Sequence, residues 1–218
     1  MNWYKKSSDR SNNRSRDDIE VKNTAKKYIS LLPSISDNTR LILSDNALDK
    51  NNLIFNNYQP EGSKPFGLWY GMGSSWIKWC LTEMPHWLSK YVYAIELDTS
   101  QILMMNSEQD LLKFTGKFYS EGYSSDINWA TVAEQYNGIE INPYIWESRL
   151  SIKTRWYYAW DVASGCVWNN ASILDITLLS DIEDINIKET NQPKTEPTIE
   201  PEVRLKEKEV NNGDINDN

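Results

Sequence analysis

Glu140 is an acidic residue in surroundings that could give its carboxylate a chemical role. It stands between two isoleucines in the short segment Gly138–Ile141, which is expected to form a strand. Because side chains alternate between the two faces of a strand, Ile139 and Ile141 should face the core and Glu140 a cleft on the other side. A carboxylate there could orient a ribose hydroxyl or stabilise a cation. The alternative is a strand glutamate that faces solvent.

Asp161 is a second acidic residue with a distinctive neighbourhood. It follows the aromatic run Trp156–Trp160 and precedes a loop that ends at Gly165. An acid beside aromatic rings at the junction of a strand and a loop can bind a sugar or a cation, or it can cap the turn through its own backbone. Lys64, which precedes Pro65 at the entrance of another aromatic segment, could bind an anionic ligand or stay exposed to solvent.

Aromatic side chains crowd the two segments that contain these charged residues. Trp69 and Tyr70 follow Lys64 closely, and Trp156, Tyr157 and Trp160 precede Asp161. Their rings could stack a planar ligand such as a base or a nicotinamide ring. The alternative is that most of them pack in the core and that one or two remain free for a ligand.

The segment Lys64–Trp87 changes character twice, and the rest of the chain is organised around it. An extended run is followed by the glycines of Gly71–Gly73, which permit a positive φ or a close approach to a ligand, and then by an aromatic helix. Ser74 or Ser75 is a suitable N-cap for this helix, and both are candidate ligand contacts. We expect the segment to lie beside Trp156–Trp168.

The supply of metal ligands and nucleophiles is small. The chain has one histidine, His86, and two cysteines, Cys80 and Cys166. A catalytic zinc site needs three protein ligands and a structural zinc site four, so no such site is expected. His86 follows Pro85 just beyond a predicted helix, which is typical of a surface histidine rather than a catalytic base. Neither a Walker A motif nor a dinucleotide-binding G-x-G-x-x-G motif is present.

Charge and composition divide the chain into three parts. Residues 1–36 carry eight basic against four acidic side chains, and residues 182–218 carry five against ten. Nine of the ten tryptophans lie between these segments. We therefore expect a mostly disordered basic tail (1–36), a globular aromatic-rich domain (37–181) and a disordered acidic tail (182–218). The acidic domain makes nucleic acid an improbable partner, whereas the tails could bind a protein.

The sequence also indicates a compartment. The first residues lack the apolar stretch of a secretory signal peptide, and no run of about 18 apolar residues could span a membrane. Two cysteines are too few for the disulfide framework of a small secreted protein. We expect an intracellular, cytoplasmic protein without a membrane partner.

Strands and short helices alternate without the regularity of repeated strand–helix–strand units, which favours an α+β fold with a mostly antiparallel sheet. Strands are expected at residues 40–45, 66–70, 91–97, 101–105, 139–141, 156–160, 167–168 and 172–179, with 91–105 forming a hairpin. Helices are expected at residues 19–32, 74–84, 107–119 and 128–136.

Three segments carry a resemblance to a known group of proteins. The stretches KPFGLWYGMGSSWIKWC, INWATVAEQYNGIEINPY and WYYAWDVASGCVW resemble an uncharacterised family of intracellular proteins of large DNA viruses and microbes. The resemblance covers roughly residues 60–170. It implies a location in the host cytoplasm or in a virion, and it brings no catalytic residue with it.

The order of elements is also similar to that of ADP-ribosyltransferases. In that fold an early strand contributes an Arg or His, a later strand an aromatic or Ser-containing segment, and a third strand a Glu that faces the ribose of NAD. The resemblance implies these roles for Arg40, for Tyr70 with Ser74 and Ser75, and for Glu140. The chain departs from the family pattern in lacking its Ser-Thr-Ser motif. The hypotheses are therefore NAD-dependent group transfer, a non-catalytic binding or interaction module, or a virion-associated protein.

Overall fold

The computed structural model describes residues 7–55, 58–120 and 126–185, with the backbone alone for residues 7–18. Nine strands are present in these ranges: β1 (Arg40–Ser44), β2 (Glu61–Gly62), β3 (Leu68–Met72), β4 (Tyr91–Leu97), β5 (Ile102–Met105), β6 (Ile127–Asn128), β7 (Gly138–Ile141), β8 (Ser164–Val167) and β9 (Ile173–Asp181). Four α-helices accompany them: α1 (Ser7–Leu31), α2 (Ser75–Glu83), α3 (Glu108–Phe118) and α4 (Trp129–Ala133). Short 3₁₀ helices include η2 (Lys50–Asn52), η3 (Pro85–Trp87), η4 (Thr99–Gln101), η5 (Trp146–Ser148), η6 (Ile152–Ala159) and η8 (Ile182–Asp184).

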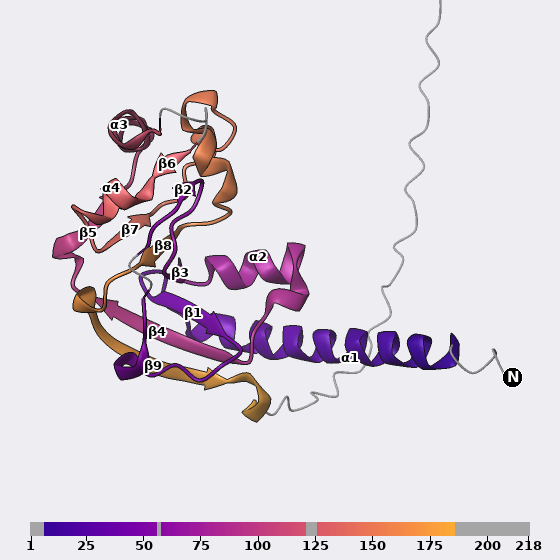
Figure 1. Ribbon diagram of the computed structural model, residues 1–218. Coiled ribbons are helices and arrows are strands. Elements are labelled where there is room, and N and C mark those ends of the chain that lie inside the picture. Colours follow the sequence, from indigo (N-terminus) through magenta and orange to yellow (C-terminus); the bar gives the residue numbers. More distant parts are fainter. Residues whose placement is uncertain (1–6, 56–57, 121–125, 186–218) are drawn as a thin grey trace, which may run out of the picture. The chain divides into compact units, whose positions relative to one another are not determined.

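Seven of the strands form one mixed sheet in the order β5-β7-β8-β3-β1-β4-β9 (Figure 1). The β5–β7 pair is parallel, and the other neighbouring pairs in the sheet are antiparallel. Strands β2 and β6 form a separate two-stranded antiparallel sheet. The expected α+β class with a mostly antiparallel sheet is confirmed.

The helices pack on one face of the main sheet. There α1 and α2 pack Tyr28, Ile77 and Cys80 against Leu41 and Val92 of the sheet. Farther along the same face, α3, α4 and η6 cover the end of the sheet that contains β7 and β8. Burying one helix-covered face of a sheet in this way is how an α+β domain builds its core.

The opposite face of the sheet carries a second apolar layer. Ile42, Tyr70, Tyr93 and Ile95 pack there, and the loop at residues 45–55 covers them with partly buried side chains. Neighbours along a strand therefore belong to different layers, as strand alternation requires.

The glycine-broken segment folds as expected. Strand β3 pairs with β8 along its length, so the two aromatic segments lie side by side. Gly73 adopts a φ of +53°, and a Cβ there would lie 2.8 Å from the backbone of Asp37. A residue other than glycine would therefore be strained at the turn into α2. Ser74 precedes that helix but makes no side-chain cap hydrogen bond.

Two of the sequence-based strand predictions are wrong. The expected 91–105 hairpin does not form, because β4 pairs with β1 and β9 while β5 pairs with β7 at the other edge. Residues 156–160 lie largely in the 3₁₀ helix η6 rather than in a strand. Trp156, Tyr157 and Trp160 are all buried at i, i+1 and i+4, a spacing that fits a helical turn and not strand alternation.

The ends of the folded body also differ from the expected boundaries. Helix α1 begins at Ser7 instead of near residue 19, and Tyr28 is fully buried with its hydroxyl donating to the Ser89 carbonyl at 2.8 Å. The last turns of α1 thus belong to the domain and not to a disordered tail. At the other end Ile182 in η8 is buried, which extends the body beyond residue 181. The expected acidic tail lies outside the described residues from 186 onward.

In the part of the chain that the structure describes, no helix has the length and apolar character needed to cross a membrane.

Candidate functional site

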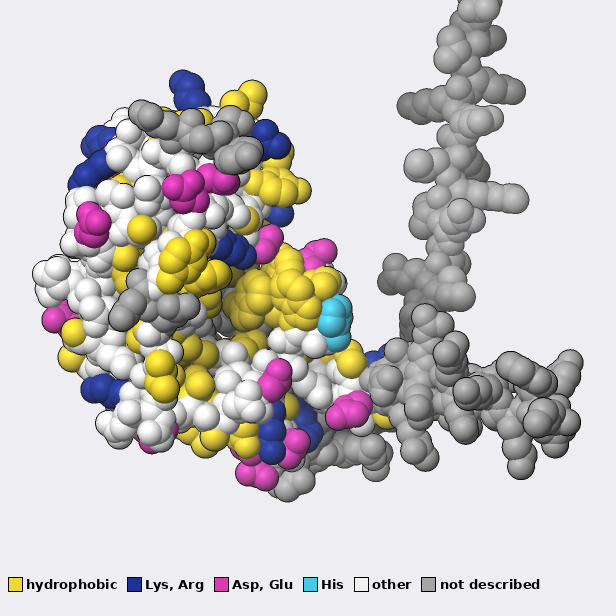
Figure 2. Space-filling model, in the orientation of Figure 1, with side chains coloured by type: hydrophobic (Ala, Val, Ile, Leu, Met, Phe, Trp, Pro, Cys, Tyr) yellow, Lys and Arg dark blue, Asp and Glu magenta, His cyan; other side chains and the backbone are white. Residues whose placement is uncertain are grey.

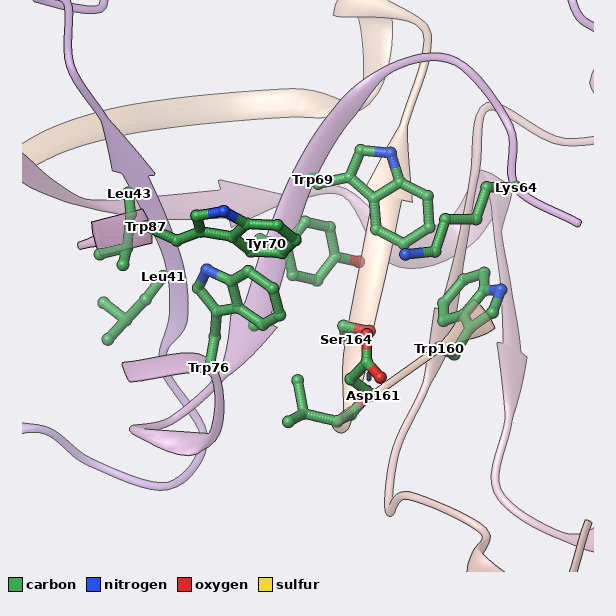
Figure 3. Close-up of a pocket in the computed structure, with 12 residues that line it drawn as sticks. Leu41, Leu43, Lys64, Trp69, Tyr70, Trp76, Trp87, Trp160, Asp161 and Ser164 are labelled. Carbon is green, nitrogen blue, oxygen red and sulfur yellow. Dashed lines mark hydrogen bonds between the residues drawn. The ribbon is translucent and has the colours of Figure 1, made fainter. Parts of the chain in front are cut away.

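A cavity of about 320 Å³ opens on the helix-covered side of the sheet, between α2–η3 and the segment that joins η6 to β8 (Figure 3). Four tryptophans from four segments line it: Trp69 of β3, Trp76 of α2, Trp87 of η3 and Trp160, which follows η6. We call it the tryptophan pocket. The remaining lining residues are Leu41, Leu43, Lys64, Tyr70, Gly71, Asp161, Val162 and Ser164.

The tryptophans form two walls on either side of the cavity (Figure 3). In one wall Trp76 stacks on Trp79 with a centroid distance of 4.9 Å, and Trp87 lies 6.1 Å from Trp76. In the other, Trp69 meets Trp160 edge to face at 4.8 Å. Trp87 is 46% exposed, so part of the first wall is open to an incoming ligand.

Lys64 supplies a positive charge between the rings of the second wall. Its Nζ lies 5.2 Å from the centroid of Trp69, within the range of a cation–π contact. Desolvation by the surrounding protein lowers the pKa of this ammonium group, and the charge of Asp161 opposes the effect. Among the described residues no carboxylate lies within ion-pair distance of Lys64. Its charge is therefore available to an anionic ligand.

Asp161 already has a cationic neighbour. Its Oδ1 lies 3.6 Å from Nη2 of Arg149, and both side chains are partly buried. Two cations, Lys64 and Arg149, thus flank one carboxylate at this end of the tryptophan pocket. The local balance of charge is positive although the whole chain carries −8.

Arg40, Tyr70 and Glu140 meet in a second polar group, the buried carboxylate cluster. Arg40 Nε donates to Oε2 of Glu140 at 2.6 Å, and the Tyr70 hydroxyl donates to the same oxygen at 3.0 Å. Gly165 of β8 lies between the strands of Tyr70 and Glu140 and is paired with both residues. A Cβ at Gly165 would lie 2.3 Å from the tyrosine ring, so the ring reaches Glu140 only because this position is glycine.

Within the buried carboxylate cluster the Glu140 side chain is shielded from solvent, whereas Arg40 is partly exposed. Glu140 is 2% exposed, so its carboxylate faces neither the expected cleft nor solvent. Burial raises the pKa of Tyr70 well above its usual value, and the Glu140 charge adds to the effect. Burial alone would lower the pKa of Arg40, but the hydrogen bond and charge of Glu140 outweigh it and raise the pKa. The hydroxyl thus stays protonated and the guanidinium charged.

Tyr70 connects the two groups. It is among the residues that line the tryptophan pocket, and its side chain packs in the layer on the opposite face of the sheet, where it donates to Glu140. Glu140 and Arg40 do not line the pocket. Ser74 and Ser75 do not line it either, because Ser74 is buried and the Ser75 hydroxyl donates to the Ala163 carbonyl at 3.1 Å.

The thiols and the histidine lie outside both groups. Burial raises the pKa of Cys80 to about 12 and that of Cys166 well above its usual value, so neither is a ready nucleophile. His86 is exposed beside Trp87, and Figure 2 shows the histidine at the edge of a broad hydrophobic patch. Within the described ranges no group of three or more His, Cys, Asp or Glu side chains could hold a metal ion.

No protein-family model, curated protein or solved structure matches this chain.

Of the eight site residues predicted from the sequence, five line the tryptophan pocket: Lys64, Trp69, Tyr70, Trp160 and Asp161. The site residues predicted from the sequence do not include Trp76, Trp87 or Arg149. Trp76 and Trp79 recur at helical spacing, which indicates an amphipathic helix but does not tell a core face from a pocket wall.

Proposed function

We propose that the chain is a binding module that takes a planar aromatic ligand carrying an anionic group into the tryptophan pocket. The observation that carries the proposal is the convergence of four tryptophans from four segments around Lys64, an ammonium group with no carboxylate partner among the described residues. Indole rings offer flat apolar faces for stacking, and the ammonium group offers a charge-assisted hydrogen bond.

The size of the tryptophan pocket narrows the ligand further. A volume of about 320 Å³ is at the small end for ligand sites and accommodates one ring system with one anionic substituent. A nucleotide base with its phosphate, or the nicotinamide end of NAD, has this chemistry. The rest of a longer ligand would extend past the half-exposed Trp87.

The titratable side chains of the pocket favour binding over catalysis. Among the lining residues these are Lys64, Tyr70 and Asp161, and the Tyr70 ring packs on the opposite face of the sheet. Tyr70 is held protonated by burial, and Asp161 is paired with Arg149. A nucleophile needs an adjacent base or a lowered pKa, and Ser164 Oγ donates instead to the Val162 carbonyl at 2.9 Å.

ADP-ribosyl transfer from NAD is the second candidate, and one specific observation favours it. Arg40 and Tyr70 both donate to Glu140 in the buried carboxylate cluster, and these are the three residues to which the order of elements assigns roles. Nicotinamide would stack on Trp69 or Tyr70, and Glu140 would position the ribose while the bond from C1′ to nicotinamide breaks and the acceptor takes C1′. This role requires Glu140 to leave Arg40 and become accessible, which is why binding without cleavage is preferred.

Calorimetric titration of the full chain with AMP, nicotinamide mononucleotide and NAD tests the binding proposal. Lys64→Met should weaken the tightest of these ligands about tenfold, because a hydrogen bond to a charged group contributes about 1.5 kcal/mol or more. Trp87→Leu should weaken it by a similar factor through lost stacking. Lys113→Met and Tyr119→Leu are matched controls. Lys113 is exposed, and the exposed fraction of Tyr119, 45%, is similar to that of Trp87. Equal losses in controls and pocket variants would contradict the proposal.

Release of nicotinamide from NAD separates the two candidates. The binding module predicts NAD association without release of nicotinamide. ADP-ribosyl transfer predicts release that Glu140→Gln abolishes while the fold persists.

A further inference from the structure

The segment from η5 to η6 displays large apolar side chains away from the tryptophan pocket. Leu150 is 81% exposed and Ile152 88%, and the aromatic rings of Trp146 and Tyr158 are also exposed. Together with the exposed cations Lys153 and Arg155 they form what we call the η5–η6 patch. Figure 2 shows hydrophobic and basic side chains intermixed along the edge where Figure 1 places this orange segment.

The η5–η6 patch has a fixed base. The hydroxyl of Thr154 donates to the Ser148 carbonyl at 2.8 Å, which closes the loop that carries Leu150 and Ile152. Both Thr154 and Ser148 are fully buried, and Trp156 directly after the loop is buried in the core with its indole donating to Thr115. The apolar side chains therefore project from a rigid support rather than from a loose loop.

Positive charge accompanies the apolar side chains. The segment contains three basic residues, Arg149, Lys153 and Arg155, and one acidic residue, Glu147, in a chain whose net charge is −8. Arg149 is paired with Asp161, so Lys153 and Arg155 supply most of the excess positive charge. The Arg149 guanidinium lies 5.8 Å from the Trp146 ring and 5.5 Å from the Tyr158 ring, so the aromatic and basic groups are contiguous. Arg149, Arg155, Leu150, Ile152 and Tyr158 also line an open hollow of about 300 Å³.

We infer that the η5–η6 patch docks the protein on the surface of an anionic lipid bilayer. The arginines that line the hollow meet the phosphate of a lipid headgroup, and Leu150 and Ile152 enter the boundary between headgroups and acyl chains. Trp and Tyr side chains prefer this boundary because each has an apolar ring and a polar edge. A bilayer accepts aliphatic side chains that stand out almost wholly exposed, whereas a protein partner needs a shaped counterpart for each.

The inference shares Arg149 with the surroundings of the tryptophan pocket but needs no ligand in that pocket. Vesicle co-sedimentation of the full chain tests it. Vesicles of phosphatidylcholine with phosphatidylserine should bind the protein at low salt, and vesicles of phosphatidylcholine alone should not. Lys153→Gln with Arg155→Gln should reduce binding about fivefold for each basic residue removed. Leu150→Ser with Ile152→Ser should reduce it about tenfold or more, since the apolar insertion is lost.

Two matched variants control for charge and for exposed apolar surface elsewhere. Lys22→Gln with Lys26→Gln removes the same charge from exposed positions of α1, and Ile54→Ser removes a side chain that is 94% exposed. Both should bind the anionic vesicles as the wild type does. None of the four variants alters a residue that lines the tryptophan pocket, and unchanged thermal midpoints verify that each remains folded.

Three results would overturn the inference. The first is equal binding to vesicles with and without phosphatidylserine, or no binding to either. The second is a loss in the α1 control as large as that in the patch variants, which would indicate attraction by net charge alone. The third is retention of an acidic peptide or of inorganic phosphate, lost in the patch variants, without any vesicle binding; the η5–η6 patch would then be a protein interface or a phosphate site.

Discussion

Replacing Glu140 by glutamine probes the buried carboxylate cluster most directly. The change keeps the shape of the side chain and removes the charge that Arg40 faces at 2.6 Å. Breaking a buried ion pair by removing one partner costs about 3–5 kcal/mol, because the other charge is left desolvated. Glu140 is 2% exposed but Arg40 is 20% exposed, so water can partly solvate the guanidinium. We therefore expect a loss of about 2–3 kcal/mol in the free energy of unfolding.

Urea unfolding of the full chain measures this loss, and thermal unfolding should show a midpoint lower by about 5–10 °C. Glu96→Gln is the matched control, since Glu96 is an exposed strand glutamate whose replacement should change stability by less than about 0.5 kcal/mol. Adding Arg40→Met to Glu140→Gln should restore part of the stability by removing the unpaired charge. A loss for Glu140→Gln no larger than that of the control would refute the argument that this ion pair stabilises the sheet.

Two further predictions concern the same region of the sheet and the charge of the tryptophan pocket. Gly165→Ala should lower the free energy of unfolding in urea by about 3 kcal/mol, because the added Cβ would overlap the Tyr70 ring. Gly116→Ala in α3 should raise it slightly, because a Cβ there meets nothing within 4 Å. Affinity for an anionic ligand should fall as pH rises through the pKa of Lys64, which lies below the usual 10.5, since only the protonated ammonium attracts the anion. Equal effects of the two glycine variants would contradict the first expectation. An affinity that stays constant from neutral pH to beyond pH 10.5 would contradict the second.

Local sequence patterns predicted most of the elements. Ser107 caps α3 through a hydrogen bond from the Asp110 amide, as the Ser-x-x-Asp spacing indicates. Gly73 makes the turn into α2 because its positive φ suits glycine. Such signals depend on a few neighbouring residues and can be recognised without knowledge of the rest of the fold.

Strand partners and the composition of the site depend on contacts that sequence spacing does not contain. Asp98 accepts from the Ser100 amide at the start of η4, and this turn sends β5 to the far edge of the sheet instead of back along β4. Strand alternation correctly predicted that Glu140 and its two buried isoleucine neighbours face opposite sides of the sheet. It could not show that Arg40, a hundred positions earlier, donates a hydrogen bond to the Glu140 carboxylate.

A titration with three indoles of different charge tests the central claim most directly. Indole-3-carboxylate, indole and tryptamine present the same ring with a negative, a neutral and a positive substituent, and calorimetry gives their affinities for the full chain. The arrangement of Lys64 and Arg149 around Asp161 predicts that the carboxylate binds about fivefold to tenfold more tightly than indole and that tryptamine binds most weakly. Equal affinity for all three, or tightest binding of tryptamine, would contradict an anion-selective tryptophan pocket.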